Sequence, residues 1–160
     1  MFIPTGRLVA AAQITGGVDY PQICGTLKLY QSNPQAVVQD DQLNRGTLVE
    51  IAVCGLPSDY DGSGVFALHI HEGGACTGRD FADSGSHFNP SGAPHPYHAG
   101  DLPPLFAYQG RAFMLVQTER FDPEEVIGRT VIIHRGIDDF TTQPAGNAGQ
   151  KIACGVIRGV

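Results

Sequence analysis

The sequence predicts an all-β domain, a sandwich or barrel of eight short strands with two long loops. The 160 residues include 21 glycines and 11 prolines, which favours a loop-rich β domain over a helical one. Short runs of β-branched residues recur between turn residues. Apolar and polar side chains alternate most clearly over residues 23–30, as in a strand with one face on a core. The length suits one domain spanning residues 1–160.

The expected strands are separated by turn signals along the whole chain. They cover residues 7–13, 22–31, 47–55, 64–71, 105–108, 111–117, 130–134 and 151–158. Gln109-Gly110 indicates a tight hairpin turn, because glycine tolerates a positive φ. One helical turn is expected over residues 122–125. Asp122 suits its N-cap, Pro123 its first position and Glu125 the reciprocal capping position.

Two long segments without a strand pattern, residues 72–104 and 135–150, lie between expected strands. Both are rich in glycine, proline, serine or aspartate. Loops of this length in a compact domain are usually functional, so these two segments are the first places to look for a site.

Charge and hydropathy exclude two classes of partner. The formal net charge is −6, whereas binding to nucleic acid calls for a basic face. No stretch of eighteen apolar residues occurs, so no membrane span is expected. The apolar run at 8–12 is too short for the hydrophobic region of a signal peptide. The expected location is therefore the cytoplasm or, for a mature form, a secreted or periplasmic compartment.

The four cysteines, Cys24, Cys54, Cys76 and Cys154, allow three fully paired connectivities. None of them lies in a CxxC motif, which argues against a redox dithiol or a thiolate zinc knuckle. Any bridge between them is expected to be structural.

All six histidines lie between positions 69 and 134, and the first five fall within thirty residues. In chain order they are His69, His71, His87, His95, His98 and His134. The spacing of His69 and His71 places both imidazoles on the same face of a strand, where they could reach one metal ion. Two solvated histidines are the alternative for this pair. His134 follows an apolar strand and could complete the set, or could be a polar strand end.

The first long loop offers ligands of a different kind. His87, His95, His98 and Asp101 provide three imidazoles and one carboxylate, a closed four-coordinate set that suits structural zinc. Three prolines stiffen this loop and lower the entropy lost when it wraps a metal. Nitrogen-rich sites also suit copper, which is redox-active.

Several sequence blocks together resemble the copper–zinc superoxide dismutase family. They are FALHIHE at 66–72, SHFNP at 86–90, HAGDL at 98–102, GRTVIIH at 128–134, GNAG at 146–149 and ACGVI at 153–157. The blocks follow the family's order and cover the chain from about residue 64 to its end. Residues before that resemble the family only in strand pattern. The resemblance implies that the eight strands form a Greek-key β-sandwich or barrel.

The resemblance also implies two metal ions that share one ligand. Copper would be held by His69, His71, His87 and His134, and zinc by His87, His95, His98 and Asp101. His87 would then be an imidazolate that bridges both ions. Asp138 matches the family's carboxylate that links the remaining nitrogens of His69 and His95, and such partners fix ring orientation.

Two of the four cysteines have a counterpart in the family. Cys76 and Cys154 match its disulfide within one subunit, with free thiols as the alternative. Cys24 and Cys54 have no counterpart, and the strand pattern points both outward. They are expected to be free surface thiols or to contact another subunit.

The activity implied is the disproportionation of superoxide to oxygen and hydrogen peroxide, with copper cycling between Cu(II) and Cu(I) and zinc structural. His87 would carry a proton, and Lys151 occupies the place of the family's usual arginine. A lysine keeps the positive charge that attracts the anion but loses the planar fork of the guanidinium. We therefore expect reduced activity. Arg79 and Arg135 are candidate compensating charges, with a solvated surface role as the alternative for each.

Two further departures from the family bear on the site. Residues 135–150 form a shorter loop than the family's guiding loop, and residues 141–144 are uncharged, so long-range steering should be weaker. The spacing between His95 and His98 is compressed, which requires a sharp turn. The alternative function is a dismutase-like protein that binds copper and zinc with little or no turnover, favoured by Lys151. A third interpretation is a recognition module with zinc as a staple. A homodimer is possible.

Overall fold

The computed structural model describes residues 6–32, 46–57 and 64–160, nearly all in strands and loops. The strands described are β1 (Gly6–Gly16), β2 (Cys24–Ser32), β3 (Thr47–Cys54), β4 (Val65–His71), β5 (Asp101–Phe106), β6 (Ala112–Thr118), β7 (Thr130–His134), β8 (Lys151–Val156) and β9 (Arg158–Gly159). Two short 3₁₀ helices, η1 (Arg79–Ser84) and η2 (Pro123–Val126), interrupt the loops. The predicted all-β class is confirmed.

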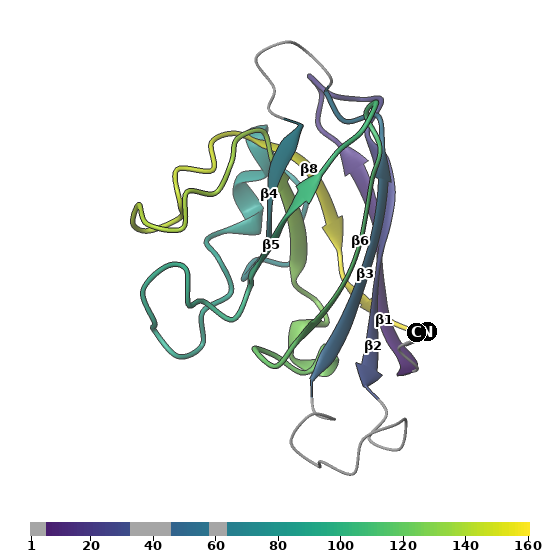
Figure 1. The fold of residues 1–160 in the computed structure, drawn as a ribbon, viewed down its shortest axis with the longest axis vertical. Coiled ribbons are helices and arrows are strands. Elements are labelled where there is room, and N and C mark those ends of the chain that lie inside the picture. Colours follow the sequence, from purple (N-terminus) through teal and green to yellow (C-terminus); the bar gives the residue numbers. More distant parts are fainter. Residues whose placement is uncertain (1–5, 33–45, 58–63) are drawn as a thin grey trace.

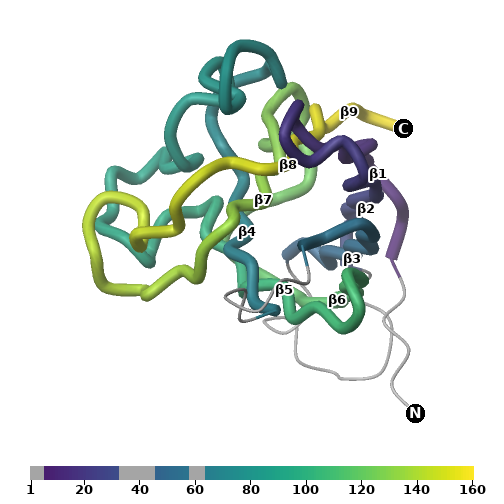
Figure 2. Tube along the Cα trace, turned by 90° about the horizontal axis from the view of Figure 1, so that it is seen from above, coloured from purple at the N-terminus to yellow at the C-terminus, as the bar shows by residue number. Residues whose placement is uncertain are grey.

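The strands form one antiparallel sheet that is nearly closed into a barrel. The order of hydrogen-bonded neighbours is β5-β4-β7-β8-β1-β2-β3-β6, and β9 pairs with β1. Figure 2 shows the strands end-on, with β5 and β6 drawn close together where the path would close. Several neighbours in this order, such as β4 and β7 or β8 and β1, are not consecutive in the chain. The chain therefore crosses over between them, as the predicted Greek-key arrangement requires.

The core lies inside this barrel and is built from alternate residues of each strand. Ile23, Leu27 and Leu29 are buried, whereas Cys24 is exposed, so the alternation predicted over residues 23–30 is confirmed. Leu68 and Ile70 of β4 likewise belong to the core. The side chains that alternate with them, His69 and His71, therefore point to the outer face of the sheet.

Strand β5 begins at Asp101, four residues earlier than predicted, and so shortens the first long loop. Pro103 and Pro104 hid this part of the strand, because prolines in a strand are rare. They are tolerated here because β5 is the last strand in the sheet order and because the pairing of β4 with β5 has an irregularity between Phe66 and Leu68. A strand end and a bulge are the places where proline does not break a ladder.

The predicted turns are confirmed by their backbone geometry. Gln109 and Gly110 both have positive φ, and Tyr108 and Arg111 exchange backbone hydrogen bonds across them. The helical turn is η2, where the Asp122 amide donates to the Glu125 carboxylate at 2.7 Å. The last predicted strand divides into β8 and β9, and η1 inside the first loop was not predicted.

The two long loops, residues 72–100 and 135–150, project from the same side of the barrel in both views (Figures 1 and 2). The first loop joins β4 to β5 and the second joins β7 to β8. Both loops cover the outer face of that part of the sheet. In the part of the chain described here, no helix has the length and apolarity needed to cross a bilayer. The outer face of β4 beneath the two loops is where the histidines gather.

Candidate metal centre

Strand β4 presents His69 and His71 on its outer face, where the loops bury them. His69 is fully buried and His71 is 2% exposed. Neighbouring β7 ends at His134, and the first loop returns to β4 through a bridge between His71 and His87. The Phe88 amide donates to the Ile70 carbonyl at 2.8 Å, which fixes this return. Three chain segments thus bring their histidines to one place.

The first candidate group comprises His69, His71, His87 and His134, whose ligating atoms all lie within 4.8 Å of one another. Each ring is oriented by a bond on its other side. His71 Nδ1 donates to the Gly85 carbonyl at 2.8 Å, and His134 Nδ1 donates to the Gly149 carbonyl at 3.1 Å. Their Nε2 atoms then face each other at 3.3 Å, as two ligands of one ion would.

The second candidate group comprises His87, His95, His98 and Asp101, again with ligating atoms within 4.8 Å. Asp101 lies at the centre, with Oδ1 2.8 Å from His87 Nδ1 and Oδ2 3.1 Å from His95 Nδ1. The compressed spacing of the loop is met by the predicted sharp turn, in which the Tyr97 amide donates to the Pro94 carbonyl at 2.8 Å.

His87 belongs to both groups, one through each ring nitrogen. Its Nδ1 faces Asp101 in the second group. Its Nε2 is buried and finds no hydrogen-bond partner among the described residues. The His87 ring lies 3.9 Å from the His69 ring, centroid to centroid, and 5.4 Å from the His98 ring. One imidazole therefore connects the two groups.

Asp138, in the second long loop, connects the groups a second time. Its two carboxylate oxygens lie 2.8 Å from His69 Nε2 and from His95 Nε2. Burial alone would raise the pKa of Asp138, but the hydrogen bonds from His69, the Phe140 amide and His95 hold it below its ordinary value. A carboxylate acceptor requires both rings to carry their proton on Nε2, so Nδ1 of each ring is left for other partners.

Gly146 has room for no side chain beside this contact. A Cβ there would lie 2.0 Å from Asp138 Oδ1 and 2.6 Å from His95 Nε2, and its φ of +65° suits glycine. The second loop therefore closes tightly over the Asp138 bridge.

The atoms without partners show that these residues fit metal ions. His69 Nδ1, His87 Nε2 and His95 Nδ1 are buried without a hydrogen bond, although buried polar atoms are nearly always paired. His95 Nδ1 lies close to Asp101 Oδ2 without bonding to it, as two ligands that converge on one ion do. Burial lowers the pKa of His71 to about 2 and of His134 to about 3. Both rings are thus kept neutral, which is the form that binds a metal.

A surface pocket of about 580 Å³ opens onto the first group, and its lining includes His71, His87, His134 and Lys151. Lys151 is the one lysine or arginine among the described residues that line it. The Lys151 ammonium donates to Ser84 Oγ at 2.8 Å and to the Gly85 carbonyl at 3.0 Å. Burial lowers the pKa of Lys151. Neither Arg79 nor Arg135 lines this pocket; Arg79 lies 4.0 Å from Asp80 instead.

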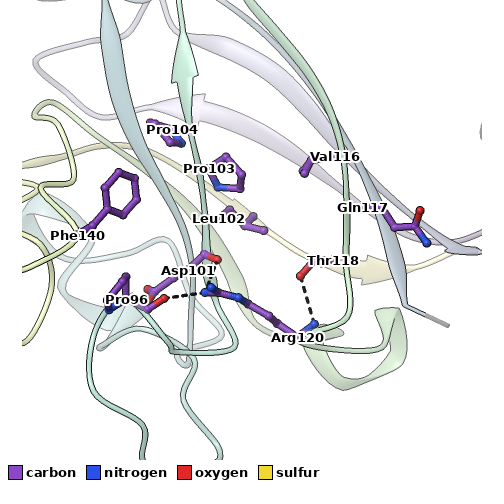
Figure 3. Close-up of a pocket in the computed structure, with 10 residues that line it drawn as sticks. All are labelled: Pro96, Asp101, Leu102, Pro103, Pro104, Val116, Gln117, Thr118, Arg120 and Phe140. Atoms are coloured by element: carbon purple, nitrogen blue, oxygen red, sulfur yellow. Dashed lines mark hydrogen bonds between the residues drawn. The ribbon is translucent and has the colours of Figure 1, made fainter. Parts of the chain in front are cut away.

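Arg120, which the sequence did not single out, holds the end of the first loop through hydrogen bonds to its backbone carbonyls. Its Nη1 donates to the carbonyls of Pro96, His98 and Asp101 at 2.8, 3.2 and 3.2 Å. Figure 3 shows the guanidinium reaching across a pocket of about 330 Å³ to Pro96 and Asp101. All three bonds come from this one nitrogen, whose two N–H groups are shared among the three carbonyls. One side chain thus holds a segment that bears two candidate ligands.

Gln143 ties the second loop to the first. Its amide nitrogen donates to the His95 carbonyl at 2.7 Å, and its amide oxygen accepts from the His95 backbone at 3.0 Å. Neither Arg120 nor Gln143 has a sequence signal beyond its residue type, because both act on backbone atoms that are brought near only by folding.

Cys76 and Cys154 form the predicted disulfide, with their Cα atoms 5.7 Å apart. The bond joins the first loop to β8, and Phe81 of η1 packs with both sulfurs and Ile132 on the outer face of the barrel. Both acceptors of Lys151 lie at the end of η1, because Ser84 is its last residue and Gly85 follows it. The disulfide thus supports one wall of the pocket.

Comparisons with known proteins agree with this architecture. Residues 24–157 match the family model described as Copper/zinc superoxide dismutase (SODC). The chain is 35% identical over 133 residues to copper–zinc superoxide dismutase 2 of Aquifex aeolicus, covering 73% of this chain and 75% of that protein. It is 32% identical over 164 residues to the human copper chaperone for superoxide dismutase, covering 94% of this chain and 53% of that protein.

A solved structure of similar shape is a SOD-like protein from Bacillus subtilis. It has 26% sequence identity and a TM-score of 0.71, with 91% of this chain and 96% of that chain covered. The similarity thus extends over nearly the whole barrel and its loops.

Proposed function

Because the chain belongs to the copper/zinc superoxide dismutase family, we propose that it disproportionates superoxide to oxygen and hydrogen peroxide at a copper ion held beside a structural zinc. The observation that carries this proposal is His87, whose two ring nitrogens serve two adjoining ligand groups. A single structural metal would need no such shared imidazole.

The proposed copper ligands are His69, His71, His87 and His134, and the proposed zinc ligands are His87, His95, His98 and Asp101. Four imidazoles beside an open pocket suit a redox-active copper, whereas three imidazoles and a carboxylate that is 7% exposed suit a closed zinc site. Asp138 orients one ring in each group, so occupation of one site favours the ligand geometry of the other.

When bound, copper supplies one-electron chemistry, taking an electron from one superoxide and giving it to a second, so that two superoxide ions and two protons become oxygen and hydrogen peroxide. The chain provides access, charge and a proton. Lys151 places a positive charge on the pocket wall, where it attracts an anion against the net charge of −6. His87 lines the same pocket, and its buried Nε2 can hold a proton close to the reacting oxygens.

Copper delivery or storage without turnover is the second candidate function. It is favoured by the similarity to a protein named as a copper chaperone and by Lys151, which lacks the bidentate donors of an arginine. Both candidates use the same ligands, so metal binding by itself does not separate them.

Turnover separates the two candidates. Superoxide decay is measured with protein loaded with copper and zinc, beside zinc-only and metal-free protein at equal concentration. We expect decay that depends on copper and far exceeds both controls. Tight binding of both metals with decay no faster than in the zinc-only control would overturn the enzyme proposal and favour metal delivery.

A further inference from the structure

Cys24 and Cys54 face each other across two neighbouring strands. β2 begins at Cys24 and β3 ends at Cys54, and the two residues are direct partners in the antiparallel register. Their sulfurs lie 3.0 Å apart, and both side chains are free and exposed. A pair of this kind escapes detection by the CxxC motif because the two cysteines are far apart in the chain.

The pair is separate from the structural disulfide, although both lie on one row of the sheet. Cys24 is the register partner of Thr15, and Thr15 is the partner of Cys154. Directly opposed residues of an antiparallel sheet point to the same face, so all four side chains lie on the outer face. Thr15 lies between Cys24 and Cys154, and Cys154 is buried and already bonded to Cys76.

The backbone geometry suits a disulfide. Opposed residues of an antiparallel pair have Cα atoms about 4.5 or 5.5 Å apart, inside the range of about 4.4–6.8 Å that disulfides require. A zinc site explains the pair less well. Two thiolates on one zinc ion would lie about 3.8 Å apart, farther than the 3.0 Å between these sulfurs, and would need further ligands. Neither group of possible metal ligands among the described residues includes Cys24 or Cys54.

We propose that Cys24 and Cys54 are a dithiol that closes to a cross-strand disulfide by exchange with low-molecular-weight disulfides. In the first step, one cysteine loses its proton and attacks the small disulfide, which forms a mixed disulfide and releases one small thiol. In the second step, the other cysteine loses its proton and displaces the second small thiol. Two protein thiols are oxidised and one small disulfide is reduced to two thiols.

The two cysteines are prepared for the second step. The two sulfurs already lie 3.0 Å apart, and their hydrogen bond, followed by charge repulsion, raises the pKa of Cys24. Both sulfurs are exposed, so a small disulfide can reach either. Once a mixed disulfide forms, the resolving sulfur is already in contact.

The test uses the full chain with the Cys76–Cys154 bond intact and oxidised glutathione as the probe. After equilibration, free thiols are alkylated and the protein is weighed by mass spectrometry. We expect the wild type to lose two hydrogen atoms, to carry no glutathione and to yield a peptide joining Cys24 to Cys54. The matched controls, Cys24→Ser and Cys54→Ser, should stop at one glutathione adduct each.

The oxidised wild type should also unfold at a higher temperature than the reduced protein, by roughly 5 °C or more, because a new link closes part of the unfolded chain. Neither serine variant should show this shift. The proposal is overturned if the wild type keeps glutathione adducts or both free thiols under conditions that modify the single-cysteine variants. Disulfide-linked dimers through Cys24 or Cys54 as the main product would equally overturn it.

Discussion

His71 and Lys151 donate to the same acceptor, the carbonyl of Gly85, at 2.8 and 3.0 Å. One backbone oxygen therefore orients a proposed copper ligand and positions the cation that faces the pocket. Because the disulfide and η1 hold this segment against β8, the charge is fixed relative to the metal site. Lys151 thus holds a positive charge at a defined place beside the proposed copper site.

Replacing Lys151 should change the rate of superoxide decay in both directions. Lys151→Gln removes the charge and should lower the rate roughly tenfold, the lower end of what electrostatic steering contributes. Lys151→Arg should raise the rate above the wild type, because it restores bidentate donors. The rates are measured on metal-loaded protein at several salt concentrations.

The matched control is Lys28→Arg, at the other lysine of the chain, which lies on β2 and pairs with Glu50 of β3 at 3.0 Å. It should leave the rate unchanged. An equal rate for Lys151→Arg and wild type would show that the absence of bidentate guanidinium donors does not limit catalysis here.

As pH rises, the rate of superoxide decay should fall at a lower pH than the titration of an ordinary lysine predicts. Burial lowers the pKa of Lys151, and the attracting charge is present below that pKa and lost as pH rises through it. The fall should therefore be centred below the ordinary value of about 10.4. Lys151→Arg should move the fall to higher pH, since arginine stays protonated. A pH profile identical in the two proteins would contradict this assignment.

The strands were predictable because they depend on local patterns, whereas the full copper set and the sharing of His87 were implied only by the resemblance to the family. Period-two alternation marked the strands, and the HxH spacing placed His69 and His71 on one face. The start of β5 was missed because Pro103 and Pro104 are read as loop residues, and only the sheet order reveals that they lie at its end.

The supporting contacts were not predictable, because they join distant segments through backbone atoms. Arg120 acts on carbonyls about twenty residues away in sequence, and the Gly85 carbonyl carries no side-chain signal at all. The facing of Cys24 and Cys54 depends on register, which the sequence pattern alone left open.

Asp138→Asn should weaken zinc binding by about 10- to 100-fold, the usual effect of losing a carboxylate behind metal-bound histidines. An amide has one oxygen acceptor, whereas His69 and His95 both donate to Asp138. Zinc affinity is measured by competition with a chelator. The neighbouring Asp139→Asn is the control, because Asp139 contacts Thr141 and Thr142; equal affinities in the two variants would contradict the role of Asp138.

Arg120→Lys should speed the loss of zinc while preserving the charge. The lysine side chain is shorter than that of arginine, so its ammonium does not reach the position of Nη1, which holds the Pro96, His98 and Asp101 carbonyls. We expect zinc to dissociate several-fold faster, a modest effect because the ligands themselves are unchanged. Arg111→Lys, at the exposed hairpin, is the control. If zinc dissociated as slowly as in this control, Arg120 would not be needed to hold the loop.

Removing the Cys76–Cys154 disulfide should destabilise the protein strongly. The bond closes a loop with a sequence separation of 78, for which chain entropy gives about 4.5 kcal/mol. The double variant with serine at both positions should therefore unfold about 10 °C lower, measured by calorimetry on metal-free protein. Cys24→Ser, an exposed substitution, should shift the midpoint by little; a comparable shift in both would exclude a special role of the disulfide.

The most direct test of the proposed enzyme is a copper titration of protein that already holds one zinc per chain, with superoxide decay measured at each step. The account predicts that the rate rises in proportion to copper and stops rising at one copper per chain, because only the group of His69, His71, His87 and His134 supports turnover. A rate that stays at the zinc-only level throughout, with copper bound, would contradict it.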